Sequence, residues 1–323
     1  MNDDNSLIKQ RRVVIMLQIV VLVFILGGLF SAYVMGRQQT AAVPNTINLD
    51  EAPLKQSNAE VPPAMERVVV RAKAAFVYDV AGKRVLYSKN AETPLPLASI
   101  TKLMTALLAH ELVDMNEDAT ISTRALMEEG SSDLLPGETL TLEELNKLAL
   151  VSSSNDAAFA LGANVGALLG DKDPTAQFVS GMNIRAEELE LNSFTFKNTT
   201  GLDLSPSEAG AVGSARDVSG LMAHILTTNP AMLTPTTKAA SRAYSNDGSY
   251  HDVENTNEVI YAIPNLLGSK TGYTDLAGGN LTIAFDAGLN RPIIITVLGS
   301  TREERFSDVV RLMRAVQANI SDL

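Results

Sequence analysis

The sequence predicts an α+β protein in which five antiparallel strands form one sheet flanked by helices, preceded by one transmembrane helix. Three observations lead to this fold class. A strand hairpin begins the globular part, helical periodicity fills its middle, and three strand-like runs precede a closing helix. Because the strands do not alternate with helices, a doubly wound parallel sheet is not expected. The first and last strands are instead expected to share one antiparallel sheet.

The composition narrows the range of functions. Of the 323 residues, 46% are hydrophobic and 20% are charged, which is typical of a globular chain of one or two domains. A net charge of −11 argues against nucleic acid as a partner, because phosphate binding needs basic patches. The lack of cysteine excludes disulfides and thiol catalysis. The histidines His110, His224 and His251 fit no ligand spacing, so neither a metal nor another cofactor is expected.

An apolar run over residues 13–36 predicts export. As a helix rising ~1.5 Å per residue, it is long enough for the ~30 Å core of a bilayer. Three basic residues precede it and only Arg37 closely follows it, so the positive-inside rule places residues 1–12 in the cytoplasm and the rest outside. We therefore expect a single-pass protein of the cytoplasmic membrane. Cleavage at the small residues 40–42 is the alternative and would give a secreted protein.

A linker and one domain follow this run. Residues 37–66 are polar and contain four prolines, which is typical of a stalk, and residues 67–323 make up the expected globular domain. The predicted strands span 74–80 and 84–88, joined by a turn at 81–83, and then 268–273, 280–286 and 292–298. The predicted helices span 99–113, 142–151, 156–169, 174–191, 215–226 and 302–318.

Local signals mark two of these helix starts. Thr141 and Glu144 have the spacing of a capping box, in which each side chain binds the backbone N–H of the other residue. Asp173 followed by Pro174 is typical of an N-cap with proline at the first helical position. Residues 229–263 contain no pattern that places an element.

Ser99 and Lys102 form an S-x-x-K pattern at the start of a predicted helix. The helix N-terminus favours negative charge that develops on the serine oxygen, and Lys102 lies one turn further on the same face. A serine nucleophile needs a base, and a lysine can act as one only if burial or a nearby cation lowers its pKa. Alone, the pattern also fits a capped helix with a solvated lysine.

Two further motifs follow. Residues 153–155, Ser-Ser-Asn, lie between two predicted helices, and Lys270-Thr271-Gly272 lies on a predicted strand. Such a strand presents a cation, a hydroxyl and an open backbone edge, and glycine allows a substrate to approach that backbone. A substrate carboxylate could bind Lys270 and Thr271 while the substrate pairs as an added strand.

With these three motifs in this order, the chain resembles the serine D-alanyl-D-alanine carboxypeptidases, which are low-molecular-mass penicillin-binding proteins. The resemblance spans residues 67–314 and includes runs at 76–87, 182–203 and 255–257. It implies the β-lactamase/DD-peptidase fold, an acyl-enzyme route that removes the last D-alanine from peptidoglycan stem peptides ending in D-Ala-D-Ala, and covalent binding of β-lactam antibiotics. Because the chain ends soon after its last predicted helix, we expect its N-terminal anchor to replace the C-terminal one of many relatives.

The resemblance also implies roles for individual residues. Ser99 would be the acylated nucleophile, Lys102 its base, and Ser153 would pass the proton to the leaving D-alanine. The backbone N–H groups of Ser99 and Tyr273 would form the oxyanion hole. The substrate itself, including its terminal carboxylate, would be bound by Asn155, Lys270, Thr271, Gly272, Tyr273 and Arg305.

Three alternatives stay open. An endopeptidase acting on D-alanyl cross-links would use the same site. A non-catalytic scaffold that binds cell-wall peptides would explain Ser154 where glycine is usual, a disfavoured replacement if φ is positive there, and Ser269 where an apolar residue is usual. A β-lactamase would need a water-activating glutamate. Glu188 lies in the fitting pattern E-x-x-L-N, but helix periodicity through it predicts a solvated face.

Overall fold

The computed structural model describes residues 62, 65, 67–130, 133–170 and 172–319. The predicted cytoplasmic tail (1–12), the transmembrane segment (13–36) and nearly all of the stalk (37–66) lie outside these residues. Within the described ranges, no helix has both the length and the apolar character that crossing a bilayer requires.

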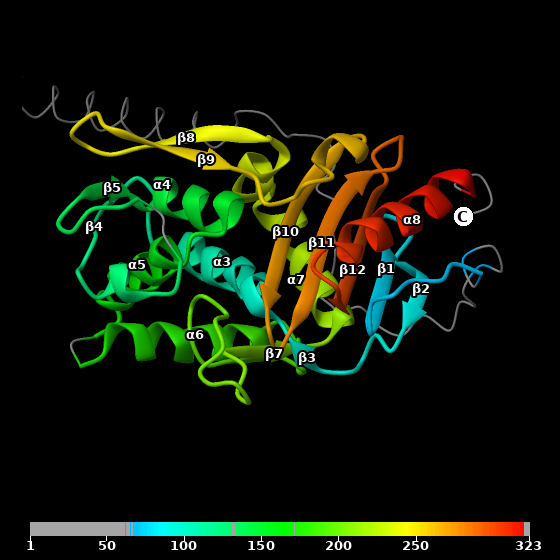
Figure 1. Ribbon diagram of the computed structural model, residues 1–323, viewed down its shortest axis with the longest axis horizontal. Helices are drawn as coiled ribbons and strands as arrows, with labels where there is room; N and C mark the ends of the chain where they lie inside the picture. The colour runs from blue at the N-terminus through cyan, green and yellow to red at the C-terminus, as the bar shows by residue number, and fades with distance from the viewer. Residues whose placement is uncertain (1–61, 63–64, 66, 131–132, 171, 320–323) are drawn as a thin grey trace, which may run out of the picture. The chain divides into compact units, whose positions relative to one another are not determined.

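A five-stranded antiparallel sheet forms the centre of the described domain (Figure 1). Its strands are β1 (Ala74–Asp79), β2 (Arg84–Lys89), β10 (Leu266–Thr274), β11 (Gly278–Asp286) and β12 (Pro292–Ser300). Their spatial order is β10-β11-β12-β1-β2, which leaves β10 at one edge. β1 pairs with β12 so that Ala74 lies opposite Leu298, and the predicted pairing of the first and last strands is confirmed.

Helices cover both faces of this sheet: α7 (Ala215–Thr228) lies against one and α8 (Glu304–Ala318) against the other (Figure 1). Successive residues of a strand point to opposite faces. Ile294 of β12 therefore joins the core on the α7 side, whereas Ile295 packs with the buried side chains of α8. Burial on both faces explains why β12 is apolar almost throughout rather than alternating.

The helical part of the domain lies beside the β10 edge (Figure 1). Its helices are α3 (Lys102–Leu112), α4 (Leu142–Lys147), α5 (Asn155–Gly166) and α6 (Pro174–Glu188). A π-helical segment, η3 (Leu148–Ser152), continues α4. The central helix is α3, in which every residue from 102 to 109 is buried.

Both predicted helix starts are confirmed at their N-caps. Thr141 Oγ1 accepts from the N–H of Glu144 at 3.2 Å, and the Asp173 carboxylate accepts from the N–H three residues later at 3.0 Å. The second predicted bond of the capping box, from the Thr141 N–H to the Glu144 side chain, is wrong. The Glu144 carboxylate instead accepts from Lys147 Nζ at 2.6 Å and from the Tyr244 N–H at 3.1 Å, which ties α4 to a neighbouring hairpin.

That hairpin lies in the stretch where the sequence placed no element. It consists of β8 (Ala240–Tyr244) and β9 (Tyr250–Glu254), and a 3₁₀ segment, η4 (Pro230–Thr237), precedes it. In the hairpin, Ala243 and Val253 are fully buried, one in each strand. One apolar contact per strand is too little to produce a visible alternation in the sequence. The smaller sheets pair β3 (Leu95–Pro96) with β7 (Ala211–Gly213), β7 with β6 (Thr195–Phe196), and β4 (Asp118–Thr120) with β5 (Thr139–Thr141).

Candidate active site

Ser99 lies in a 3₁₀ turn, η1 (Ala98–Thr101), that leads directly into α3. Asn280 of β11 holds this turn by donating through Nδ2 to the two carbonyl groups just before it, both at 3.0 Å. On another side, a Cβ at Gly201 would lie only 1.9 Å from the carbonyl oxygen of Ala98. The turn with Ser99 is therefore fixed between β11 and the loop that contains Gly201.

The amine of Lys102 has three polar partners. Nζ lies 2.7 Å from Ser99 Oγ, 2.7 Å from Asn155 Oδ1 and 2.9 Å from the Thr200 carbonyl oxygen. The side chain is fully buried. This burial lowers the pKa of Lys102 to about 7, although the Glu128 carboxylate acts in the opposite direction. About half of the amine is then neutral near pH 7, whereas an ordinary lysine with a pKa of ~10.4 is neutral in under ~0.1% of molecules.

These partners also orient the lone pair of Lys102. Asn155 Oδ1 and the Thr200 carbonyl can only accept hydrogen bonds, so they take the two N–H groups of a neutral amine. The lone pair is then left for the Ser99 hydroxyl. Asn155 Nδ2 donates to the Glu129 carbonyl at 2.6 Å, which keeps Oδ1 turned toward Lys102. The neutral amine is therefore placed to accept the hydroxyl proton of Ser99.

The second motif has an ordinary backbone conformation at its middle residue. Ser154 has a φ of −53°, and its Oγ caps α5 by accepting from the Ala157 N–H at 3.0 Å. The left-handed conformation belongs to Ser153, with a φ of 62°. The condition that would disfavour serine, a positive φ at residue 154, is therefore not met, because the chain turns one residue earlier, where it leaves η3. The turn places Ser153 Oγ 2.8 Å from Lys270 Nζ.

Lys270 of β10 is buried, and its Nζ also donates to the Thr271 carbonyl at 2.9 Å. Burial lowers the pKa of Lys270 well below its ordinary value, and the positive charges of Lys102 and Arg305 lower it further. A carboxylate entering this region would favour the protonated form of Lys270. The site is thus suited to an anion and poorly suited to a further cation.

Gly272 brings the end of β10 against the turn that contains Ser99. A Cβ at Gly272 would lie 2.9 Å from the Leu97 carbonyl oxygen and 3.2 Å from the Ser99 nitrogen. Arg305 Nη1 donates to the Gly272 carbonyl oxygen at 2.8 Å, and burial lowers the pKa of Arg305. Its buried Nε has no hydrogen-bond partner in the described part of the chain. The next residue, Tyr273, is 42% exposed, so the strand leaves the protein interior here.

Several residues without a role in the sequence motifs also shape the site. Glu129 and Thr200 act through backbone carbonyls, which no side-chain pattern reveals. Thr256 Oγ1 lies 2.6 Å from Thr271 Oγ1, and its run at 255–257 was part of the family resemblance. Asn280 is completely buried. The sequence feature that could have identified it is a polar amide at the start of an otherwise apolar predicted strand.

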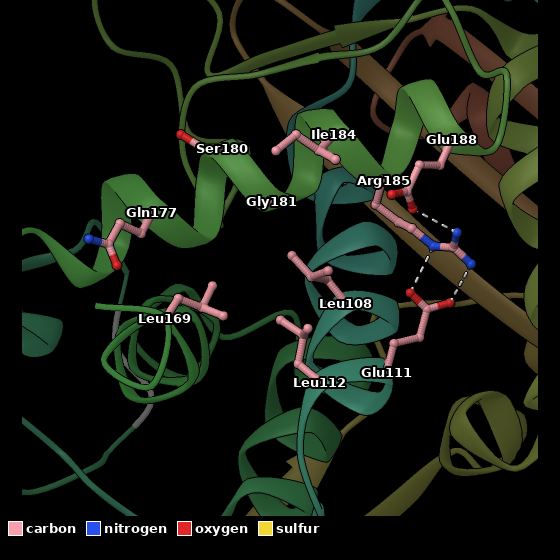
Figure 2. A pocket seen from close by; sticks show the side chains of 10 residues that line it. All are labelled: Leu108, Glu111, Leu112, Leu169, Gln177, Ser180, Gly181, Ile184, Arg185 and Glu188. Atoms are coloured by element: carbon pink, nitrogen blue, oxygen red, sulfur yellow. Dashed lines mark hydrogen bonds and ion pairs between the residues drawn. The ribbon is translucent and has the colours of Figure 1, made fainter. Parts of the chain in front are cut away.

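Glu188 lies on α6, on the wall of a pocket between α6 and the C-terminal half of α3 (Figure 2). Its side chain is 58% exposed and pairs at 3.0 Å with Arg185, which also binds Glu111 of α3 at 2.8 Å. Glu111 is nine residues beyond Lys102, or ~13 Å along the helix. The predicted solvated helix face is confirmed. Among the described residues, no three His, Asp or Glu side chains are grouped so as to hold a metal ion.

Comparisons with known proteins agree with this geometry. The sequence model of one family, described as D-alanyl-D-alanine carboxypeptidase, matches residues 57–302. D-alanyl-D-alanine carboxypeptidase DacF from Bacillus subtilis (strain 168) is 34% identical over 248 residues, which are 75% of this chain and 61% of that protein. This chain therefore spans less than two thirds of the length of DacF. A D-alanyl-D-alanine endopeptidase from Pseudomonas aeruginosa is 31% identical over 249 residues, covering 75% of this chain and 76% of that protein.

A solved structure has the same fold. Penicillin-binding protein D2 from Listeria monocytogenes, in its cefotaxime-bound form, matches with a TM-score of 0.66 and 29% sequence identity. The match covers 76% of this chain and 97% of that one. Since the family match extends over most of the sequence, the chain belongs to the D-alanyl-D-alanine carboxypeptidase family of serine peptidases.

Proposed function

We propose that this protein is a serine-type D-alanyl-D-alanine carboxypeptidase that removes the terminal D-alanine from peptidoglycan stem peptides through an acyl-enzyme on Ser99. One observation carries the proposal: the buried Lys102 amine, whose pKa is lowered to about 7, lies 2.7 Å from Ser99 Oγ. It supplies the base that a serine nucleophile needs at neutral pH. Membership of the family and the name of the relative DacF support the same activity.

Each residue of the site has a role in one step of the proposed reaction. Lys102 takes the hydroxyl proton as Ser99 Oγ attacks the carbonyl carbon of the penultimate D-alanine, and the N–H groups of Ser99 and Tyr273 stabilise the oxyanion. The C–N bond then breaks. The proton that Lys102 took passes through Ser153 to the nitrogen of the leaving D-alanine. Ser153 lies beside Lys270. Water finally hydrolyses the ester and frees Ser99.

The terminal carboxylate of the substrate binds at the β10 edge. Lys270 and Arg305 supply positive charge, and Thr271 supplies a hydroxyl. Gly272 lets β10 approach the turn that contains Ser99, so a substrate that pairs with the edge as an added strand lies beside the nucleophile. Asn155 Nδ2 has two N–H groups, so one can donate to a carbonyl of the substrate amide while the other stays on the Glu129 carbonyl. A β-lactam, which also bears a carboxylate, acylates Ser99 in the same place.

Residues 67–323 act on the outer side of the cytoplasmic membrane, where peptidoglycan lies. The apolar run at 13–36 and the basic residues before it support a single-pass anchor. Membrane fractions should therefore retain the full-length chain after an alkaline wash. A shortened chain in the medium, beginning after residue 40, would instead indicate signal cleavage.

The detergent-solubilised chain is expected to release D-alanine from diacetyl-Lys-D-Ala-D-Ala and to form a covalent adduct with a fluorescent penicillin. Ser99→Ala should abolish both, because it removes the attacking oxygen. Ser180→Ala, which changes an exposed serine on α6, is the matched control and should change neither. Folded wild-type protein that gives neither product would support the non-catalytic scaffold instead.

Endopeptidase activity is the second candidate, and the relative from Pseudomonas aeruginosa that is named an endopeptidase favours it. The same acyl-enzyme would form, but the leaving group would be the cross-linked stem of another peptide. Purified cross-linked muropeptides separate the two activities, since only an endopeptidase converts dimers to monomers.

We expect a long-lived penicillin adduct and negligible nitrocefin turnover, with Glu188→Gln changing neither. Release of the adduct needs an activated water, and Glu188 is paired with Arg185 on an exposed helix face. Since ~1.36 kcal/mol of barrier is worth tenfold in rate, a shortfall of ~5 kcal/mol slows release by between three and four orders of magnitude. Rapid nitrocefin hydrolysis that is lost in Glu188→Gln would identify a β-lactamase.

A further inference from the structure

Thr256 contacts the proposed carboxylate-binding residue Thr271. The two Oγ1 atoms are 2.6 Å apart, and Thr256 Oγ1 lies 3.4 Å from the Val151 carbonyl oxygen. The backbone N–H of Thr256 binds the same carbonyl at 3.2 Å. Val151 precedes Ser153 by two residues, so Thr256 lies where the segment with Ser153 meets β10.

The neighbours of Thr256 hold it in this place. Asn255 Nδ2 donates to two carbonyl groups at the end of η4, at 2.8 and 2.9 Å. Asn257 Nδ2 donates to Ser269 Oγ at 3.2 Å, while its Oδ1 accepts from the Val259 N–H at 3.2 Å. Ser269, a departure from the family pattern, therefore has a buried partner. These bonds on both sides of Thr256 hold its backbone beside Thr271.

The positions of the two hydroxyl oxygens allow two arrangements of protons, because each hydroxyl has one proton to donate. Either Thr271 donates to Thr256, which then donates to Val151, or Thr256 donates to Thr271. The first leaves Thr271 with only lone pairs for a ligand, and the second leaves its proton free. A carboxylate can only accept, so it binds the second arrangement. This arrangement also has the better geometry, since 3.4 Å to Val151 is long for an O–H···O bond.

We propose that Thr256 is a positioning residue for recognition of a free terminal carboxylate, an inference that rests on the proposed function. Its hydroxyl donates to Thr271 Oγ1, fixes the orientation of that side chain, and directs the Thr271 proton toward the substrate. Hydrogen bonds in such a chain polarise one another, so Thr271 becomes a better donor to an anion. The pair therefore favours peptides that end in a carboxylate over those that end in an amide.

The test compares Thr256→Val, Thr256→Ser and the nearby control Thr237→Val, whose hydroxyl donates within η4 at 2.8 Å. Steady-state kinetics use diacetyl-Lys-D-Ala-D-Ala and the same peptide ending in D-alaninamide. Adduct formation is measured with benzylpenicillin and its methyl ester. For carboxylate ligands, Thr256→Val should raise KM, or slow acylation, about 3- to 10-fold, the usual worth of one neutral hydrogen bond, with kcat nearly unchanged. Amide and ester ligands should be unaffected, and Thr256→Ser and Thr237→Val should resemble wild type.

The outcomes separate the possible roles. If Thr256→Val weakens the reaction equally with carboxylate and uncharged ligands, Thr256 only holds β10 in place. If the variant reacts with carboxylate ligands as well as or better than wild type, Thr256 competes for the Thr271 proton. Either result overturns the inference. Wild-type protein that binds penicillin but releases no D-alanine would refute the proposed function alone. The rates of adduct formation with benzylpenicillin and its methyl ester would still test the role of Thr256. Wild-type protein that does neither would overturn both.

Discussion

Replacing Lys102 is expected to slow acylation of Ser99 by about 10²–10⁴-fold, the usual contribution of a general base. The buried amine is 2.7 Å from Ser99 Oγ, and alanine at this position would also leave a cavity. Lys102→Met keeps most of the side-chain volume and separates loss of the base from loss of packing. The measurement is the rate of penicillin adduct formation, together with the unfolding temperature of each variant.

The same residue sets the expected pH profile. Only the neutral amine accepts a proton, and burial lowers the pKa of Lys102 to about 7. The kcat/KM of the wild type should therefore rise with pH through about 7, whereas an ordinary lysine would give a rise near ~10.4. Lys197→Met, which changes an exposed lysine, should keep both the rate and the profile. A near-normal rate in Lys102→Met would assign the base to another group.

Gly201→Ala is expected to destabilise the domain and to abolish most of the acylation. Gly201 has a φ of 81°, and its added Cβ would overlap the Ala98 carbonyl oxygen at 1.9 Å. The turn with Ser99 would have to move, and so would Thr200, whose carbonyl binds Lys102 at 2.9 Å. Strain in the left-handed region and overpacking together amount to about 2–5 kcal/mol of unfolding free energy.

Gly248→Ala is the matched control for this prediction. Gly248 has a φ of 89°, but nothing lies within 4 Å of the position of its Cβ. Its substitution should cost only the conformational strain, about 1–2 kcal/mol, and leave acylation intact. Thermal unfolding and penicillin labelling measure both effects. Equal destabilisation by the two substitutions would show that the contact with Ala98 does not constrain the turn.

The parts of the fold that sequence patterns predicted are those with strong burial. The runs at 280–286 and 292–298 are apolar because helices cover both faces of their strands, and such runs stand out in a sequence. The hairpin β8–β9 was missed because Ala243 and Val253 are its fully buried positions. Its turn residues, Asn-Asp-Gly at 246–248, were the signal that could have located it.

For the site, the motifs predicted which side chains take part but not the hydrogen bonds between them. Helical spacing placed Ser99 and Lys102 together, since three residues make about one turn. It could not show that Asn155, 53 residues away, shares the Lys102 amine, because that contact depends on how α5 packs beside α3. Backbone contributions, such as the Thr200 carbonyl and the left-handed Ser153, have no side-chain signature and need the folded chain to become visible.

The position of β10 at the edge of the sheet affects how the protein avoids aggregation. Antiparallel pairing directs the backbone groups of Ser269, Thr271 and Tyr273 away from β11. The Ser269 N–H is already bonded to Thr236 Oγ1 at 3.0 Å, and the Thr271 carbonyl accepts from Lys270. Both bonds occupy backbone groups that an added strand of typical length would need. A second copy of the chain should therefore extend the sheet poorly at this edge, whereas a short peptide can still pair with the groups nearer Tyr273.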